Sequence, residues 1–283
     1  MGPVAQLDSA TRQLARLRTS WFEGSNPSGP AGEKMIEFAL KTAEKAGRVA
    51  MRHFRRKMKT AFKSKQDILT IADTEAEKLV IREIHRRFPN HGILAEETGE
   101  HNPKSDYLWV VDPVDGTVNY AAGLPFFSVS IALAYKKQPL LGVVYDPFHN
   151  EFIYAEKNRG SYLNGRRLRV GDERNLINCV VATDLGHKRS RLIARRIKNL
   201  IPVTRAVRIL GSASLGLSYV AVNRVQAYIH NDIQPWDAAA ASVIIREAGG
   251  NLLNFSGKSW ELYDRTAIAS NQSLSKQLLE YVR

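Results

Sequence analysis

The chain has 283 residues, of which 44% are hydrophobic, and its formal net charge is +13. This length is enough for a large buried core, and no apolar run approaches the roughly 20 residues that a membrane span requires. The single cysteine, Cys179, excludes an internal disulfide and favours a reducing, cytoplasmic compartment, whereas the positive charge favours anionic partners: phosphorylated substrates, nucleic acid or acidic proteins.

Residues 1–34 differ from the rest of the chain. They show no sustained helical or strand period and end in a turn-rich run of Gly, Ser, Asn and Pro over residues 24–32. Two short pieces, Pro3–Asp8 and Gly24–Pro27, resemble the translation of the wrong strand of a transfer-RNA gene. We therefore expect the natural chain to start at Met35; the alternative is a genuine disordered extension.

A helical pattern begins at Met35. Small or aromatic residues recur at three- and four-residue steps and predict one packed face: Ala39, Ala43, Ala46, Ala50 and Phe54. Between Lys45 and Lys65 there are nine Lys or Arg and no acid. A solvated helix face is the favoured interpretation of this run, and an anion-binding surface is the alternative. A second, highly charged helix is predicted over Thr74–Arg87.

The most informative stretch runs from Leu108 to Phe126. An apolar run, residues 108–111, predicts a short buried strand that ends at Asp112-Pro113. Asp115 follows three residues later, and two carboxylates at the end of a buried strand repel each other unless a cation lies between them. Mg²⁺ accepts such oxygens, and the N–H groups of Gly116-Thr117 suit a phosphate. The alternative is an ordinary turn with two capping aspartates.

Two further acidic positions are candidate metal ligands. A short apolar strand over 92–95 ends at Glu96-Glu97, and Asp237 follows Trp236 at a predicted helix start. Alone, the glutamates would indicate surface charge, and Asp237 would complement a helix dipole. Before Asp237 lies the turn Gly211-Ser212-Ala213, whose small residues permit close backbone approach.

Strands are predicted over residues 127–135, 140–144 and 151–156, with a hairpin connection over 160–165. This pattern is typical of an antiparallel sheet flanked by helices. A change in composition near 168–178 indicates a boundary between two halves. In the second half, His187–Leu200 predicts a basic amphipathic helix, solvated rather than groove-reading, with a packing side of Leu192, Ile193, Ile197 and Leu200.

The string Asp112-Pro-x-Asp-Gly-Thr-x-Asn-Tyr, preceded by Trp-Val-Val, resembles the signature of the inositol monophosphatase family of Mg²⁺-dependent, lithium-sensitive phosphatases. Residues 63–73, Glu96-Glu97-Thr98, the turn at Gly211 and Trp236-Asp237 extend the resemblance over about 35–283. It implies an α+β fold, a layered α-β-α-β-α sandwich. The resemblance also implies an antiparallel sheet in the first half (35–175), a smaller mixed sheet in the second (176–283), and a homodimer, which is the family habit.

The resemblance also implies the roles of individual residues. Glu96, Asp112 and the carbonyl of Val114 would bind one Mg²⁺, and Asp112, Asp115 and Asp237 a second, with a third, weaker ion near Glu96. Thr117, backed by Asp73, would orient and help deprotonate the attacking water, with Glu96 in the same catalytic group. Five of these residues would border the substrate: Asp112, Val114, Asp115, Thr117 and Asp237. Further contacts would hold it in place: Gly116, Gly211, Ser212, Ala213 and His230.

The activity implied is hydrolysis of a phosphate monoester. Asn119-Tyr120 matches the inositol-phosphatase version of the motif, so inositol 1-phosphate or a related small polyol phosphate is expected. His230, however, stands where the family has a glutamate that contacts the inositol hydroxyls. Fructose 1,6-bisphosphate and histidinol phosphate are therefore alternative substrates, and an exposed loop residue is the alternative interpretation of His230. A non-catalytic role in binding RNA or the transcription machinery is the rival from another class.

Overall fold

The computed structural model describes residues 35–55, 60–62, 68–185 and 191–282. The expectations for residues 1–34, and for most of the basic run beyond Arg55, lie outside these ranges. Within them, no helix combines the length and apolar character needed to cross a lipid bilayer.

Two helices, α2 (Met35–His53) and α3 (Ile71–Arg87), form the first layer and cover one face of an eight-stranded sheet. The order of its strands is β10-β9-β8-β7-β6-β5-β3-β4, and only the β3–β5 pair is parallel. Their bounds are Gly92–Ala95 (β3), Gly99–His101 (β4), Tyr107–Asp115 (β5), Ser128–Tyr135 (β6), Gln138–Asp146 (β7), Glu151–Glu156 (β8), Gly160–Leu163 (β9) and Arg166–Arg167 (β10). A two-stranded ribbon, β1 (Thr60–Phe62) and β2 (Ile68–Thr70), precedes α3.

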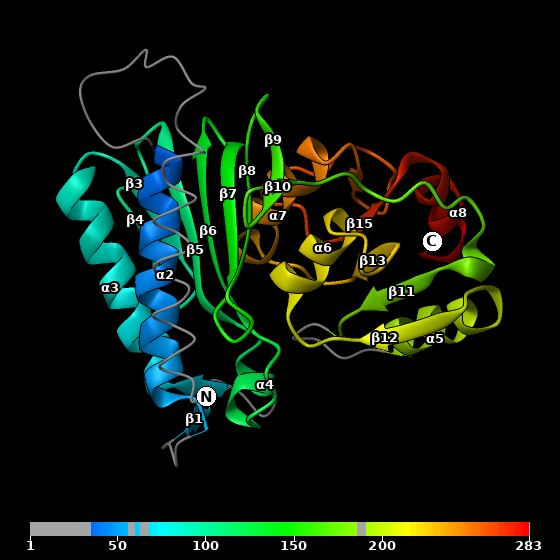
Figure 1. Ribbon diagram of the computed structural model, residues 1–283, viewed down its shortest axis with the longest axis horizontal. Coiled ribbons are helices and arrows are strands. Elements are labelled where there is room, and N and C mark those ends of the chain that lie inside the picture. The colour runs from blue at the N-terminus through cyan, green and yellow to red at the C-terminus, as the bar shows by residue number, and fades with distance from the viewer. Residues whose placement is uncertain (1–34, 56–59, 63–67, 186–190, 283) are drawn as a thin grey trace.

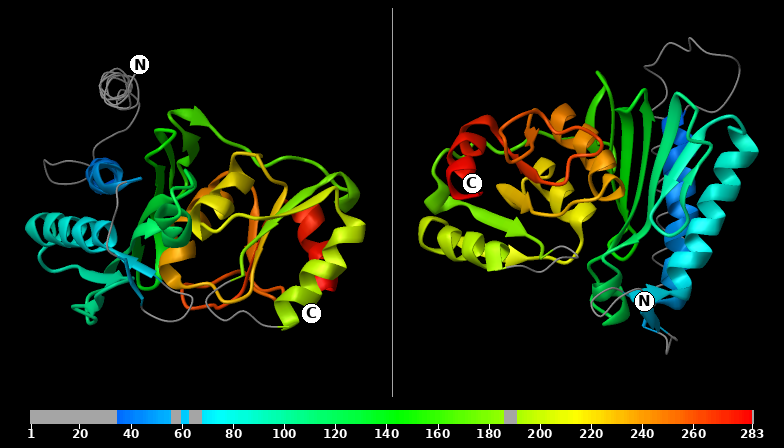
Figure 2. Two further views of the ribbon diagram at one scale, coloured as in Figure 1. Left: turned by 90° about the horizontal axis from the view of Figure 1, so that it is seen from below. Right: turned by 180° about the vertical axis from the view of Figure 1, so that it is seen from behind.

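The middle layer, α6 (Ala213–Ala221) and α7 (Pro235–Glu247), lies between the first sheet and a five-stranded mixed sheet (Figures 1 and 2). The order of this second sheet is β12-β11-β13-β15-β14. Its strands are Val180–Thr183 (β11), Ala206–Ile209 (β12), Ala227–His230 (β13), Asn251–Leu253 (β14) and Ala267–Ser270 (β15). The outer helices, α5 (Arg191–Leu200) and α8 (Gln272–Val282), complete the predicted α-β-α-β-α order. Short α4 (Thr117–Ala121) and the 3₁₀ turns Leu176–Asn178 and Ile201–Val203 connect these elements.

The predicted face of α2 is confirmed: its four alanines and Phe54 are all buried. On the other side of the helix, basic residues have acidic partners. Lys45 Nζ lies 2.6 Å from Glu83, Arg48 pairs with Glu44, and Arg52 lies 3.9 Å from Glu75. The described part of the basic run is therefore a solvated face whose charge is partly neutralised, as the favoured interpretation predicted.

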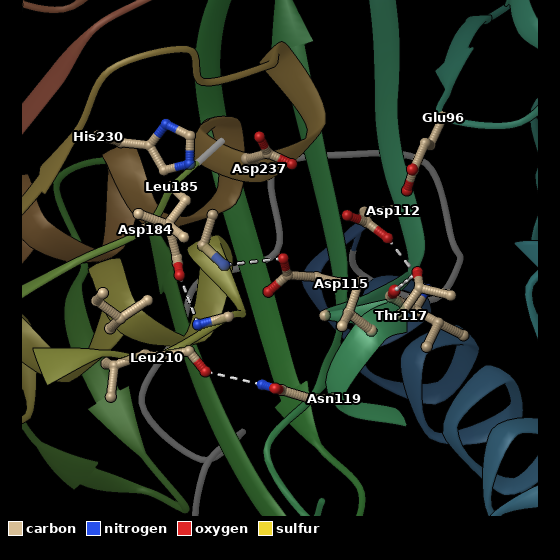
Figure 3. A pocket seen from close by; sticks show the side chains of 16 residues that line it. Glu96, Asp112, Asp115, Thr117, Asn119, Asp184, Leu185, Leu210, His230 and Asp237 are labelled. Atoms are coloured by element: carbon tan, nitrogen blue, oxygen red, sulfur yellow. Dashed lines mark hydrogen bonds between the residues drawn. The ribbon is translucent and has the colours of Figure 1, made fainter. Parts of the chain in front are cut away.

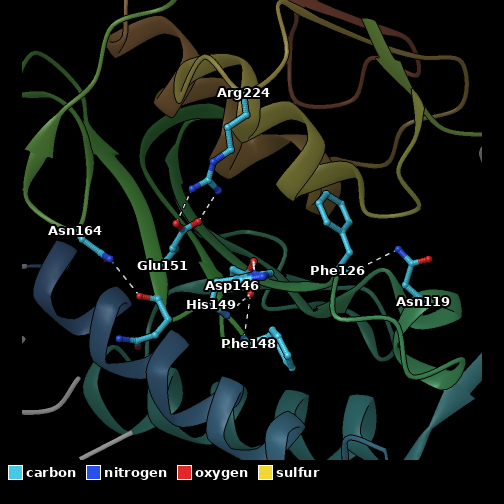
Figure 4. A network of polar contacts seen from close by, with 9 residues as sticks. Asn119, Phe126, Asp146, Phe148, His149, Glu151, Asn164 and Arg224 are labelled. Carbon is cyan, nitrogen blue, oxygen red and sulfur yellow. Dashed lines mark hydrogen bonds and ion pairs between the residues drawn. The ribbon is translucent and has the colours of Figure 1, made fainter. Parts of the chain in front are cut away.

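The two halves meet where α7 crosses the first sheet. Gly142 of β7 permits this approach, because a Cβ there would lie 2.3 Å from the carbonyl oxygen of Ala240. At the edge of the contact, Arg224 donates to both carboxylate oxygens of Glu151 at 2.5 and 2.6 Å (Figure 4). Its guanidinium also lies over the Tyr219 ring, 4.7 Å from the centroid. Packing and a bidentate ion pair thus join the halves.

Three local predictions need correction. Gly160–Leu163 is a strand rather than part of a connection, and the turn is Asn164-Gly165. The helix predicted from Thr74 begins at Ile71, where Thr70 and Asp73 form a capping box. In α5, Ile193 is buried but Leu192 is 44% exposed. Neighbouring positions lie about 100° apart around a helix, so a narrow contact cannot bury both.

Cys179 is fully buried beside the second sheet. Burial raises the pKa of its thiol to about 11, so the thiolate is scarce at neutral pH. This environment favours a structural role for Cys179 over a nucleophilic one.

Candidate active site

The conformation of β5 brings its two aspartates to one side of the sheet. The strand does not end at Asp112-Pro113, as predicted, but continues to Asp115. Asp112 pairs with Ser130 and Asp115 with Ser128, so one extra residue of β5 is accommodated in a bulge. Side chains three residues apart on a regular strand point to opposite faces, whereas the extra residue restores a common face. Pro113, which has no N–H group, is tolerated at such a bulge.

Three aspartates from two distant parts of the chain converge here. Asp112, Asp115 and Asp237 each offer a carboxylate oxygen, and these atoms lie within 4.8 Å of one another. All three side chains are buried. Glu96, which follows β3, lines the same cavity of about 310 Å³. Figure 3 shows the four acidic side chains converging on one space. The predicted convergence of the acidic positions is therefore present in the fold.

This grouping has a large electrostatic cost when the carboxylates are ionised. Burial raises the pKa of Asp112 well above its usual range, and the charges of Glu96, Asp115 and Asp237 raise it further. Burial also raises the pKa of Asp237 well above its usual range, with Asp115 as the next cause. A divalent cation would remove both penalties, and oxygen-only ligands are what Mg²⁺ prefers. The residues present thus fit a magnesium site.

Asp115 is held by the start of α6. Its Oδ1 accepts the Ala213 N–H at 2.9 Å, and its Oδ2 accepts the Ser214 N–H at 3.0 Å. The hydroxyls of Ser128, at 3.1 Å, and Ser212 also donate to Oδ2. Ser212 does not itself line the cavity but orients a residue that does. The α6 N-terminus therefore fixes the position of the Asp115 carboxylate.

Thr117 and Asp73 form a hydrogen-bonded pair at the start of α4. The Thr117 hydroxyl lies 3.1 Å from Asp73 Oδ1 and 3.0 Å from the carbonyl oxygen of Val114. Asp73 also accepts the Thr70 N–H at 2.9 Å within the capping box of α3. Burial raises the pKa of Asp73. Asp73 lies behind Thr117, outside the cavity lining, and Thr117 lines the cavity.

Two glycine turns, one from each half, touch beside the carboxylates. Gly116 has φ +95°, and a Cβ there would lie 2.9 Å from the carbonyl oxygen of Gly211. Gly211 has φ +77° and is equally crowded by Asn119. Both positions combine a left-handed conformation with close approach, which a side chain would prevent. The predicted residues Gly116, Gly211 and Ala213 all line the cavity.

His230 is a buried residue of β13 that lines the cavity, so the exposed-loop interpretation is wrong. The backbone N–H of Asp232 donates to His230 Nδ1 at 3.2 Å. Because Nδ1 is an acceptor, a neutral imidazole carries its proton on Nε2.

Several residues that line the cavity were not predicted as site residues: Val118, Asn119, Asp184, Leu185, Ile209 and Leu210. Asp184 follows β11 and is 7% exposed; burial raises the pKa of its carboxyl to about 7. Asp184 stands at the end of an apolar run, the same signal that identified Asp112. The apolar members have no such signal. No Lys or Arg of the described residues contributes to this lining.

Residues 32–283 match the model of the inositol monophosphatase family. The chain belongs to this family. It is 38% identical over 255 residues to Nus factor SuhB of Pasteurella multocida, covering 88% of this chain and 96% of the relative. It is also 38% identical over 251 residues to a fructose-1,6-bisphosphatase/inositol-1-monophosphatase of Thermotoga maritima, with 87% and 95% covered.

Solved structures agree with this assignment. The crystal structure of the extragenic suppressor protein SuhB from Bartonella henselae superimposes with a TM-score of 0.84 at 32% identity, covering 88% of this chain and 98% of that chain. Members of the family are Mg²⁺-dependent phosphatases. The chain is therefore a phosphatase that hydrolyses phosphate monoesters.

Proposed function

We propose that the chain hydrolyses inositol 1-phosphate or a related small polyol monophosphate in the cavity bordered by the four acids. The observation that carries this proposal is the group of three buried aspartates, with carboxylate oxygens within 4.8 Å of one another, beside the Thr117–Asp73 pair. A purely structural role gives no reason to bury so much like charge.

Asp112, Asp115 and Asp237 would hold Mg²⁺ together with Glu96 and the carbonyl of Val114. Bound Mg²⁺ supplies positive charge to the phosphoryl oxygens and acidifies water. Because the Val114 carbonyl would hold Mg²⁺, the Thr117 hydroxyl would donate its single proton to Asp73. Its oxygen lone pairs would then face away from that carboxylate and accept from the attacking water. Asp73 is the proton acceptor behind Thr117, and its raised pKa brings its basicity closer to that required near neutral pH.

The phosphoryl group would lie against the backbone of Gly116 and Thr117, and the leaving alcohol against Gly211, Ala213 and His230. Ser212, which does not line the cavity, would act by holding Asp115. The absence of Lys and Arg from the described lining favours a monophosphate, because a second phosphate would find no cationic side chain there: the His230 imidazole, whose Nδ1 accepts a hydrogen bond, is neutral. The Thermotoga relative, named for both activities, makes fructose 1,6-bisphosphate the second candidate substrate.

Turnover of inositol 1-phosphate, fructose 1,6-bisphosphate and histidinol phosphate, each with Mg²⁺ or with a chelator, tests this proposal. We expect Mg²⁺-dependent phosphate release, highest for the polyol monophosphate and abolished in Asp112→Asn. Release that continues in the chelator, or that is unchanged in Asp112→Asn, would contradict the proposal. A clear preference for the bisphosphate would favour the second candidate.

A non-catalytic role in a transcription complex is the alternative function. The name of the Pasteurella relative and the net charge of +13 support it. A complex with RNA that weakens steeply as salt rises, formed equally by wild type and Asp112→Asn, would establish this role beside the hydrolase activity.

Several finer properties belong to the same proposal. We infer two to three Mg²⁺ per active site, inhibition by Li⁺, a homodimer and a cytoplasmic location. Residues 35–175 would form the half that carries most metal ligands, and residues 176–283 the half that completes the site with Asp237.

A further inference from the structure

One peptide group in the wall of the cavity is held from both sides. It joins Leu210 to Gly211, between β12 and α6, and both residues line the cavity. The Leu210 carbonyl accepts a hydrogen bond from Asn119 Nδ2 at 2.7 Å. The Gly211 N–H donates to Asp184 Oδ1 at 2.5 Å. Figure 3 shows the two side chains approaching this peptide from separate elements. The peptide thus has no freedom to rotate without breaking one of these bonds.

Asn119 connects this peptide to the first half of the chain. The same Nδ2 donates to the carbonyl of Phe126 at 2.9 Å, so one amide bridges two backbone segments 84 residues apart (Figure 4). Phe126 in turn packs edge-on against Tyr219 of α6, with ring centroids 5.5 Å apart. A Cβ at Gly211 would lie 2.8 Å from Asn119 Nδ2, which shows how closely the amide approaches the turn.

Asp184 is itself fixed from behind. The hydroxyl of Tyr228, on the neighbouring strand β13, donates to Asp184 Oδ2 at 2.5 Å. The Tyr228 ring packs on α6, where a Cβ at Gly216 would lie 2.5 Å from Tyr228 Cε2. Both carboxylate oxygens of Asp184 therefore have partners among the described residues, and both partners lead to the start of α6.

The start of α6 carries the N–H groups that hold Asp115. Ala213 and Ser214 donate to this carboxylate immediately after the clamped peptide. A rotation at Gly211 would move these donors, because Ser212 and Ala213 follow it directly. Asn119 and Asp184 hold the Leu210–Gly211 peptide, and the residues that follow this peptide hold Asp115.

We propose that Asn119 and Asp184 are positioning residues that clamp the Leu210–Gly211 peptide and thereby orient the Asp115 carboxylate for Mg²⁺. The proposal deepens the phosphatase function and rests on it. Neither side chain needs to contact the reacting atoms. Displacements of about 1 Å in a catalytic group can cost on the order of 100-fold in rate, so the loss of either clamp should be visible in kcat.

Kinetics and calorimetry of Asn119→Ala and Asp184→Ala test the clamp. We expect each substitution to lower kcat at least fivefold at saturating Mg²⁺ with KM changed less than threefold. Each should also weaken Mg²⁺ binding at least fivefold in calorimetry without substrate, because Asp115 is no longer held. If both folded variants keep kcat and Mg²⁺ affinity within less than fivefold of wild type, the proposal is overturned.

Asn164→Ala is the matched control. Asn164 also makes two side chain–backbone hydrogen bonds: it donates to the Asn150 carbonyl and accepts from the Phe152 N–H, in the β9–β10 turn away from the cavity (Figure 4). This variant should lose thermal stability yet keep kcat within twofold. A fall in kcat as large as that of Asn119→Ala would mean that general loosening explains the effect, and would overturn the clamp.

Two further variants remain decisive if the alanine variants do not fold. Asp184→Asn keeps an acceptor for the Gly211 N–H and a donor for the Tyr228 oxygen, so it should bind Mg²⁺ within fivefold of wild type. A larger loss would mean that Asp184 acts through its charge, against the proposal. Asn119→Ser is too short to reach both carbonyls and should reproduce the Mg²⁺ loss. A wild type that binds Mg²⁺ but releases phosphate from no ester would refute the phosphatase function alone, since calorimetry still tests the clamp.

Discussion

At the scale of single residues, the site combines three mutually repelling aspartates with the neutral hydroxyl of Thr117, which is hydrogen-bonded to Asp73. Thr117 lines the cavity, and its hydroxyl lies 3.1 Å from Asp73 Oδ1, the acceptor to which the proposed mechanism directs its proton. This orientation gives the hydroxyl oxygen a defined direction for accepting a hydrogen bond from water. The backbone N–H of the same residue would contact the phosphoryl group, so the two functions of Thr117 can be separated by substitution.

Thr117→Ala should lower kcat by about 100- to 10,000-fold, the range expected for losing a positioned proton-transfer partner. KM should change little, because the backbone N–H remains. Thr117→Ser, which keeps the hydroxyl, should retain kcat within about tenfold of wild type. Steady-state kinetics at saturating Mg²⁺ measures both variants. Equal losses in the two variants would show that the hydroxyl is not the important group.

The sequence could predict Glu96 and Asp112 because each follows an apolar run that ends at a turn, and Asp184 obeys the same rule. Asp237 has no such run before it and was predicted from its position after Trp236 at a helix start, through the family resemblance. Ile209, which is 54% exposed and lines the cavity, was not predictable. An apolar side chain has no chemical signature that distinguishes a wall of the cavity from an exposed surface position.

At the scale of helices and strands, the bulge in β5 determines whether the site can form. Pro113 was correctly recognised as a break in regular pairing, but its consequence was wrong, since the strand continues past it. Local sequence shows that an N–H group is missing. Whether the strand ends or bulges depends on the partner β6, which supplies Ser130 and Ser128 in register on either side. That information is tertiary.

The two neighbouring residues of α5 offer a matched test of element packing. Ile193→Ala removes a side chain that is 3% exposed and should lower the free energy of unfolding by about 2–4 kcal/mol. Leu192→Ala removes one that is 44% exposed and should change it by less than about 0.5 kcal/mol. Urea denaturation of both variants measures the difference. Equal costs would contradict the position of α5 on the second sheet.

At the scale of the whole molecule, charge is distributed very unevenly. The chain has 41 Lys and Arg against 28 Asp and Glu, yet its cavity is lined by acids with no Lys or Arg among the described residues. Net charge alone therefore gave no information about the site. The layer order was predictable through the resemblance to the family, and hydrophobic periodicity predicted several of its helices and strands. The contact of Gly142 with α7 and the clamp on Gly211 required the folded chain.

The buried acids of the cavity predict how the stability of the metal-free protein depends on pH. In a chelator, the raised pKa values of Asp112, Asp237 and Asp184 mean that the folded state binds more protons than the unfolded state above about pH 4. Stability from these groups is complete below that pH and is lost as pH rises through the folded values, by about 1.4 kcal/mol per pH unit for each extra proton. Because the pKa of Asp184 in the folded state is about 7, the stability that this group contributes is lost between about pH 4 and 7.

Thermal unfolding from pH 5 to 8 measures this dependence. Metal-free wild type should lose stability as pH rises, and Asp112→Asn should lose less. Added Mg²⁺ should stabilise wild type most at pH 8, where the carboxylates are ionised and protons no longer compete with the ion. A metal-free protein that becomes more stable with rising pH, with no difference between wild type and Asp112→Asn, would contradict the electrostatic description of the cavity.

The most direct test of the central claim is a crystal structure of the protein with Mn²⁺ in place of Mg²⁺, phased to reveal the anomalous scattering of the metal. We predict Mn²⁺ bound by the carboxylates of Asp112, Asp115 and Asp237, with Glu96 completing the site. Anomalous density that is absent from this cavity at saturating Mn²⁺, or that lies only elsewhere on the molecule, would contradict the account.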